Sequence, residues 1–277
     1  MLRLLSANML RLRKAPEFRL LSIATLMISV AMIRSGAGTA ASMQARGFDV
    51  GLDDFYFEMA PFLGAIMAVF VSLFLGTEYS DGTMRNKLVV GHTRANIYLA
   101  GFLTCFLADV VFTALWFVGG LPGLVLIGPF EMGLWGALTY FFVAVGVAAV
   151  FTALFVGLST LYRNKAVAVV LALVLWLGLA LLGSGVCDRL DEVEFHGGMA
   201  MIDGEFVMME DTPNPMYLSG GKRTAAEYLC RVLPTGQAIE MTTAGITTPG
   251  LNIAVSAAVT AAVTAAGIRL FCRKDLK

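Results

Sequence analysis

TEYSDGTMRNKLVVGHTR, residues 77–94, is a short polar and basic stretch between two long apolar runs. One run ends near Gly76 and the next begins near Ala95. Apolar runs of this length are typical of transmembrane helices, because about 20 helical residues span the hydrocarbon core of a bilayer. The stretch is therefore predicted to be a loop at the membrane surface, where a membrane protein can meet a soluble partner.

The composition of the whole chain is that of a membrane protein. Of its 277 residues, 58% are hydrophobic and 14% are charged, and the mean hydropathy is +0.77. Soluble domains are nearer half apolar and a quarter charged. The sequence predicts an all-α integral membrane protein, embedded in a lipid bilayer, with six transmembrane helices. The predicted spans are residues 18–33, 59–76, 96–118, 134–160, 166–186 and 251–271.

Lysine and arginine residues near the span ends predict the orientation, because they are enriched on the cytoplasmic side. Fourteen of the twenty fall on the side of the two termini and residues 77–94, and six fall on the other side. The acidic residues show the reverse bias, with ten of them in residues 187–250. Both termini and residues 77–94 are therefore predicted to be cytoplasmic, and residues 187–250 extracellular.

Residues 1–17 are predicted to form an amphipathic helix in the membrane interface, ahead of a transmembrane domain over residues 18–277. Pro16 either ends this helix or begins the next one. The helix is either a generic basic anchor on the cytoplasmic side of the membrane or a connecting helix that also contacts a cytoplasmic partner. A cleaved signal peptide is the competing interpretation of the N-terminus. The long leader with a helical pattern argues against it. The apolar stripe at helical spacing is Leu2, Leu5, Met9 and Leu12.

A short surface helix is predicted inside the polar loop. Thr83 follows a turn-prone cluster and can cap a helix over residues 84–90. Gly91 suits the left-handed position that often follows a helix end, and Thr93 can cap the next span. A helix of two turns is not stable alone in water. We therefore expect the span ends and a bound partner to hold it.

The two sides of this short helix differ in character. Met84 and Leu88 share one face at a spacing of four residues. Arg85 and Lys87 fall away from that face. The helix should therefore lie across the membrane surface with a small apolar face and basic flanks.

The loop also carries the spacing E-Y-x-x-G-T-x-R-N-x-L-x-x-G-x-x-R. This pattern resembles the loop after the second span of ABC-2 type permeases, the membrane subunits of bacterial ABC transporters. The six-span layout, the basic leader and the large external segment before the last span are similar too. An ordinary basic cytoplasmic turn is the alternative. The matching residues are Glu78, Tyr79, Gly82, Thr83, Arg85, Asn86, Leu88, Gly91 and Arg94.

In that family the loop contains the coupling helix, which seats in a groove on the ATP-binding subunit. The resemblance implies that Arg85 and Lys87 meet the ATPase, and that Glu78, beside Tyr79, closes the end of the second span. A local salt bridge from Glu78 to Arg85 or Arg94 is the alternative. The docking set carried over by position is Gly82, Thr83, Arg85, Asn86, Lys87, Leu88, Gly91 and Arg94.

The sequence has no GxxxxGK[ST] phosphate-binding loop. The chain is therefore not expected to be an enzyme or to bind a cofactor, and ATP and Mg²⁺ are expected on a separate ATP-binding subunit. Six spans make half of the usual pathway in this family, which implies a second permease copy or a paralogue. No nucleic-acid partner is expected.

The resemblance implies export of a hydrophobic or amphipathic molecule, such as a peptide, drug or lipid-like compound, across the bacterial cytoplasmic membrane. A non-transporting immunity or sensor subunit is the first alternative. An intramembrane enzyme is the second, and it would need a nucleophile–base pair or a metal cluster at membrane depth.

Asp109 falls inside the third predicted span. An unpaired carboxylate is costly there, so its side chain should face the protein interior or be protonated. It is either a substrate or coupling site, or a buried hydrogen-bond partner of Thr113 or of another span, or it lies nearer the membrane surface than the predicted span places it.

The segment over residues 187–250 is too long for a turn, and residues 222–232 and 237–244 are predicted to be short helices. Cys187 and Cys230 both fall on the predicted outer side, where a disulfide can persist. Two free thiols are the alternative. The cysteines and histidines lack metal-ligand spacing, so no metal site is predicted.

Overall fold

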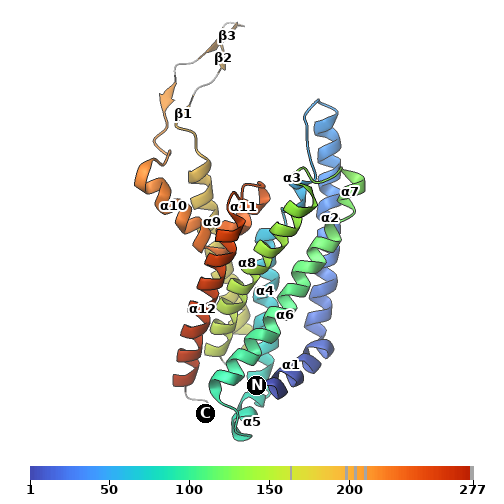
Figure 1. The fold of residues 1–277 in the computed structure, drawn as a ribbon, viewed down its shortest axis with the longest axis vertical. Coiled ribbons are helices and arrows are strands. Elements are labelled where there is room, and N and C mark those ends of the chain that lie inside the picture. The colour runs from blue at the N-terminus through green and yellow to red at the C-terminus, as the bar shows by residue number, and fades with distance from the viewer. Residues whose placement is uncertain (163, 197–198, 203–204, 209–210, 275–277) are drawn as a thin grey trace.

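The computed structural model describes residues 1–162, 164–196, 199–202, 205–208 and 211–274. In this part of the chain, long helices pack side by side with smaller elements at both ends (Figure 1). Each predicted span lies inside one long apolar helix, which confirms the prediction of six candidate membrane spans. These helices are Pro16–Gln44, Asp53–Ser80, Arg94–Leu126, Gly133–Leu161, Lys165–Asp191 and Pro249–Arg273.

Twelve helices and four short strands follow one another along the described chain. The helices are α1 (Leu2–Lys14), α2 (Pro16–Gln44), α3 (Asp53–Tyr56), α4 (Ala60–Ser80), α5 (Thr83–Val89), α6 (Arg94–Gly120), α7 (Gly123–Leu126), α8 (Gly133–Leu161), α9 (Lys165–Asp191), α10 (Gly220–Val232), α11 (Pro234–Thr242) and α12 (Pro249–Arg273). The strands are β1 (Phe195–His196), β2 (Met199–Ile202), β3 (Glu205–Met208) and β4 (Thr212–Pro213).

Four short strands lie between α9 and α10 in the described part of this otherwise helical fold. β1 pairs antiparallel with β4, and β2 pairs antiparallel with β3. The sequence signal was present, since an Asp-Gly pair between two short apolar segments is typical of a hairpin. Residues 197–198, 203–204 and 209–210 of the predicted extracellular segment lie outside the described residues. The residue ranges of α10 and α11 agree within three residues with those of the two short helices predicted there.

α4 is the central helix of the bundle. In the most apolar 18-residue stretch of this span, 67% of the residues are buried. The corresponding shares for α2 and α9 are 22% and 17%. α4 packs against α2, α6, α8 and α9, and its contacts are rich in fully buried aromatic rings such as Phe70 and Phe74. A displacement of α4 would therefore be transmitted to most of the other spans, because close-packed interiors transmit strain.

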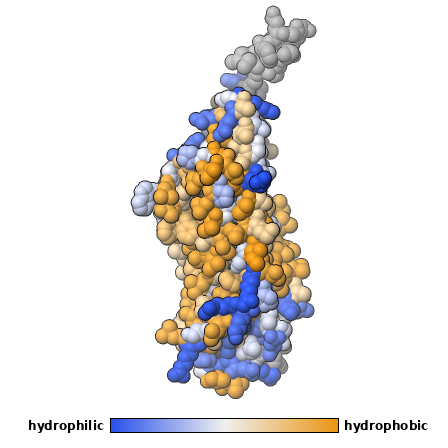
Figure 2. Space-filling view, turned by 90° about the vertical axis from the view of Figure 1, so that its right-hand side faces the viewer, coloured by the Kyte–Doolittle hydropathy of each residue, from blue (hydrophilic) through white to orange (hydrophobic). Residues whose placement is uncertain are grey.

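The smaller elements are divided between the two ends of the bundle. Both termini, α1 and α5 lie at one end, and α3, α7, α10 and the strands lie towards the other (Figure 1). We call these the α5 end and the α10 end. Hydrophobic residues dominate the middle of the face in Figure 2, and hydrophilic residues gather towards its ends. The two termini and residues 77–94 thus share one end, as their charges predict.

α1 packs against the bundle through a stripe that shares only Leu12 with the apolar stripe expected at the membrane interface. Leu4, Asn8 and Leu12 are its buried residues, spaced four apart, whereas Leu2 is 80% exposed. The apolar pattern alone did not reveal this face because a polar residue, Asn8, lies at its centre. Pro16 begins α2, with an extended backbone at Ala15 separating the two helices.

Candidate functional site

α5 is a seven-residue helix held between the ends of α4 and α6. Its N-cap is Gly82, whose φ of +69° lies in the left-handed region that favours glycine. Thr83 is the first helical residue, and its hydroxyl donates a hydrogen bond to the Glu78 carbonyl at 3.0 Å. The predicted capping role of Thr83 is therefore wrong, because the glycine makes the turn and the threonine ties it back to α4.

The predictions for the far end of α5 are confirmed. Gly91 has a φ of +93°, and its amide donates to the Leu88 carbonyl at 2.9 Å. The next amide, of His92, donates to the Lys87 carbonyl at 3.2 Å, which satisfies groups that a helix end leaves open. Thr93 caps α6 by accepting from the Asn96 amide at 3.3 Å.

Glu78, in the last turn of α4, is the buried anion of the α5 end. Its side chain is 2% exposed, and its Oε1 accepts a hydrogen bond from Lys87 Nζ at 2.6 Å. The same oxygen is ion-paired with the Arg11 guanidinium group of α1. The alternative of a salt bridge from Glu78 to Arg85 or Arg94 is therefore wrong, because the carboxylate faces α1 and the inner side of α5.

α1 contributes three further contacts at this point. Arg11 Nη2 donates to the Phe74 carbonyl at 2.9 Å, and its guanidinium carbon lies 3.8 Å from the centre of the Phe74 ring. Asn8 Oδ1 accepts from Lys87 Nζ at 3.1 Å. Asn8, Arg11, Glu78 and Lys87, which we call the Glu78 cluster, thus join α1, α4 and α5. Asn8 and Arg11 were missed at the sequence level because they lie more than sixty residues from Glu78.

Tyr79 and Arg94 connect the α5 end to α8 and α12. The Tyr79 hydroxyl donates to the Thr160 carbonyl at 3.0 Å, and Lys274 Nζ donates to the same carbonyl at 2.8 Å. Arg94 Nη1 donates to the Phe271 carbonyl at 3.2 Å, in the last turn of α12. The Arg94 guanidinium group is therefore engaged inside the chain, where it complements the negative end of a helix.

The two sides of α5 differ in their exposure. Met84 is 4% exposed, and Leu88 packs partly buried against the core, as their spacing predicts. Lys87 also turns inward, with a side chain that is 16% exposed. The opposite side consists of exposed residues, and two of them are apolar. This outer face of α5 comprises Arg85, Asn86, Val89 (82% exposed) and Val90 (77% exposed).

Val89 and Val90 were not singled out from the sequence. The available signal was two adjacent valines within an otherwise polar loop. Clustered apolar side chains left exposed on a protein surface mark contact sites. The outer face of α5 thus leaves two apolar side chains uncovered by the rest of the described chain, while its inner face is bonded to α1 and α4.

Asp109 lies in α6 and is completely buried, which confirms that it faces the interior. Its Oδ2 accepts a hydrogen bond from the Thr152 hydroxyl of α8 at 2.5 Å. The Thr113 hydroxyl bonds instead to the Asp109 backbone carbonyl at 2.9 Å. The carboxyl group of Asp109 is therefore bonded to another span, through Thr152, and not to the Thr113 side chain.

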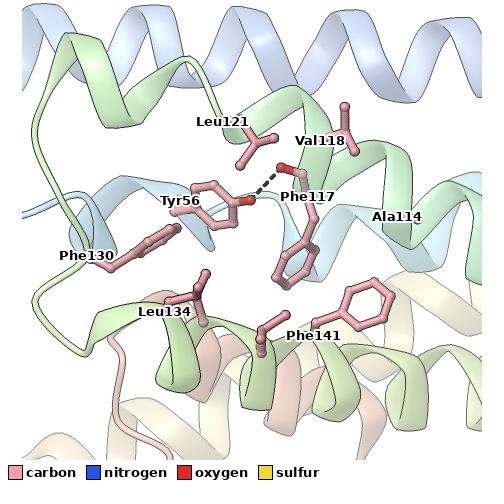
Figure 3. A pocket seen from close by; sticks show the side chains of 10 residues that line it. Tyr56, Ala114, Phe117, Val118, Leu121, Phe130, Leu134 and Phe141 are labelled. Atoms are coloured by element: carbon pink, nitrogen blue, oxygen red, sulfur yellow. Dashed lines mark hydrogen bonds between the residues drawn. The ribbon is translucent and has the colours of Figure 1, made fainter.

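An apolar pocket of about 290 Å³ opens between α6 and α8, beside α3 (Figure 3). Tyr56 lines it, but its hydroxyl is directed to the Phe117 carbonyl at 2.5 Å, so the wall presents little polarity. A larger groove of about 700 Å³ lies between α6, α8 and α12. Neither is lined by a charged residue.

Two further findings concern metals and thiols. Within the described ranges, no group of three or more His, Cys, Asp and Glu side chains is placed to hold a metal ion. Cys187 and Cys230 are brought together at the α10 end, with sulfur atoms 2.9 Å apart.

Comparison with known proteins agrees with this geometry. A family model for ABC-2 family transporter proteins matches residues 4–178. The match runs from α1 into α9 and includes the Glu78 cluster and α5. Among curated proteins, none matches the chain. Since the matched residues cover more than half of a chain with six candidate spans, the protein belongs to the ABC-2 family, as a non-catalytic membrane subunit of an ABC transporter.

Proposed function

We propose that this chain is the permease subunit of an ATP-driven exporter, and that α5 is the coupling helix on which a separate ATP-binding subunit docks. The observation that carries the proposal is the two-sided character of α5. Lys87 on the inner side reaches the buried Glu78 carboxylate at 2.6 Å, while Val89 and Val90 on the other side are largely exposed. A helix bonded on one side and open on the other can receive a force and pass it inward.

The Glu78 cluster provides the path for that force. Displacement of α5 pulls on Lys87, and through Glu78 it reaches the end of α4 and the Arg11 side chain of α1. Tyr79, the next residue of α4, is bonded to the end of α8. Because α4 packs against four other spans, closure of the ATPase re-packs the bundle between inward- and outward-facing states.

The α5 end faces the cytoplasm in this proposal, and the α10 end faces outward. The support is the sorting of basic residues towards the α5 end, as in other membrane proteins. ATP and Mg²⁺ are bound by the ATP-binding subunit, and the membrane is the bacterial cytoplasmic membrane. α1 lies in the interface and serves as the connecting helix.

A second permease copy or a paralogue completes the pathway. α2 and α9 leave most of their most apolar stretches unburied by the rest of the chain. Those surfaces are available to a partner subunit as well as to lipid. Closed two-fold assemblies are the commonest arrangement for such subunits.

The cargo is a hydrophobic or amphipathic molecule. The support is the apolar lining of both cavities, whose walls offer shape and hydrophobic contact rather than charge. A strongly charged cargo would lose its hydration there without gaining a partner.

The test is to purify the chain from its native membranes in mild detergent and to reconstitute it in vesicles. We expect an ATP-binding subunit to co-purify, and an amphipathic cargo to move across the vesicle membrane only when ATP is present. Cargo binding without ATP-dependent movement would contradict export and favour a sequestering immunity or sensor subunit.

A further inference from the structure

Two cysteine thiols lie in contact at the α10 end. Cys187 is near the end of α9, and Cys230 is in the last turn of α10, 43 residues further along the chain. Their sulfur atoms are 2.9 Å apart, and both side chains are buried. Non-bonded sulfur atoms do not normally approach so closely. A further approach of about 0.9 Å would reach the covalent S–S length of about 2.05 Å.

We propose that Cys187 and Cys230 form a structural disulfide that fastens α10 to α9, a proposal that rests on the outward orientation of the α10 end. Disulfides form and persist outside the cytoplasm, whereas cytoplasmic thiols are kept reduced. The other two described cysteines have different settings. Cys105 is buried in α6, and Cys272 is exposed at the α5 end.

The bond is made by thiol–disulfide exchange with an external protein disulfide. One cysteine thiolate attacks that disulfide to give a mixed disulfide, and the second thiolate displaces the reduced oxidant. The pair loses two protons and two electrons, and the oxidant gains both as a dithiol. The hydrogen bond with Cys187 and burial raise the pKa of the Cys230 thiol. Both side chains are also buried in the folded chain, so exchange takes place before α10 packs, and the finished bond is sheltered from reductants.

The first turn of α11 lies beside this pair. The Thr235 hydroxyl donates to the Leu179 carbonyl of α9 at 2.5 Å, and Cys187 Sγ lies 3.8 Å from the Gly236 carbonyl. A Cβ atom at Gly236 would lie 2.3 Å from the Cys230 carbonyl oxygen, so the approach of α10 and α11 requires glycine. The disulfide therefore closes a junction at which α9, α10 and α11 already meet.

α11 carries this junction to the rest of the bundle. Gln237 Nε2 donates to the Ser256 hydroxyl of α12 at 3.0 Å. Just after α11, the Ile246 amide donates to the Tyr140 hydroxyl of α8 at 3.1 Å. A covalent link between α9 and α10 thus fixes the α10 end, while the α5 end is left free to respond to its partner.

The thiols are counted by denaturing membranes in excess N-ethylmaleimide and measuring the intact mass before and after reduction. We expect two alkyl groups without reduction, on Cys105 and Cys272, and four after reduction. In the Cys187→Ser variant all three remaining thiols should react without reduction. The matched Cys105→Ser variant should keep the bond and take up one alkyl group. Four alkyl groups on the unreduced native chain would overturn the proposal.

A separate experiment isolates the assumption about sidedness. In a variant with all four cysteines replaced by serine, exposed Lys222 of α10 is changed (Lys222→Cys), and intact cells are treated with a membrane-impermeant maleimide. Labelling places α10 outside, so that free thiols in the native chain would count against the disulfide alone. Absence of labelling, with labelling restored after lysis, would contradict the outward orientation and with it the proposal.

Discussion

Glu78 Oε1 accepts a hydrogen bond from Lys87 Nζ at 2.6 Å, across the turn that joins α4 to α5. The carboxylate is 2% exposed and is also paired with Arg11 of α1. One buried anion therefore holds three helices together at the end where the ATP-binding subunit is proposed to dock. Removing one member of a buried ion pair leaves the other charge uncompensated, which is more costly than losing a surface pair.

Glu78→Gln should uncouple the ATPase from transport. The amide keeps the shape but leaves Arg11 and Lys87 without a counter-charge, so we expect a loss of about 1.5–3 kcal/mol of stability, as for hydrogen bonds to charged groups. ATP-driven transport by folded protein should fall more than ATPase binding. Exposed Asp81, three residues further on, provides the control variant Asp81→Asn, which should behave as wild type. Full transport by Glu78→Gln would contradict this role.

Lys87→Met and Arg85→Met should fail in different ways. Lys87 points inward to Glu78, so its loss should lower the melting temperature of the detergent-solubilised chain. Arg85 is exposed, and surface substitutions usually change stability by no more than about 0.5 kcal/mol. Its loss should weaken only the affinity for the ATP-binding subunit. The same loss of stability in both variants would show that the two sides of α5 are not distinct.

Much of this arrangement could be predicted from the sequence. The six spans followed from hydropathy, and the α5 helix followed from residues 77–94 with Gly91 at its end. The partners of Glu78 could not be predicted. Arg11 and Asn8 are distant in sequence, and only the packing of α1 against the bundle brings them to the carboxylate. Lys87 was placed on the outer face because a two-turn helix gives too few residues to fix its rotation.

Asp109→Asn should preserve the bundle, whereas Asp109→Ala should destabilise it. The Asp109 carboxyl group contacts the Thr152 hydroxyl at 2.5 Å, and an amide can keep that link between α6 and α8. Alanine loses the link and leaves a cavity, at a cost of about 1–3 kcal/mol. Thermal unfolding in detergent measures the difference. If Asp109→Asn is stable but abolishes transport, the carboxylate acts on cargo or coupling rather than as a structural link.

Gly267→Ala should destabilise the contact between α12 and α6. A Cβ atom there would lie 2.0 Å from the Tyr98 hydroxyl oxygen, and overpacking of this kind costs about 1–3 kcal/mol. That hydroxyl has no hydrogen-bond partner among the described residues, so Tyr98→Phe alone should be nearly neutral. Combined with Gly267→Ala, it should restore part of the lost stability, because the ring Cζ atom of residue 98 still lies 2.7 Å from the added Cβ. Additive losses in the double variant would contradict a direct clash.

The outer face of α5 provides the most direct test of the proposed docking. Val89 is 82% exposed at the α5 end, and Val125 of α7 is 88% exposed at the other end of the bundle. The measurement is the affinity of the purified chain for its ATP-binding subunit, compared between Val89→Asp, Val125→Asp and the native protein. We predict that Val89→Asp weakens binding at least about tenfold, or about 1.4 kcal/mol, and that Val125→Asp leaves it unchanged. Native affinity in the Val89→Asp variant would contradict docking through α5.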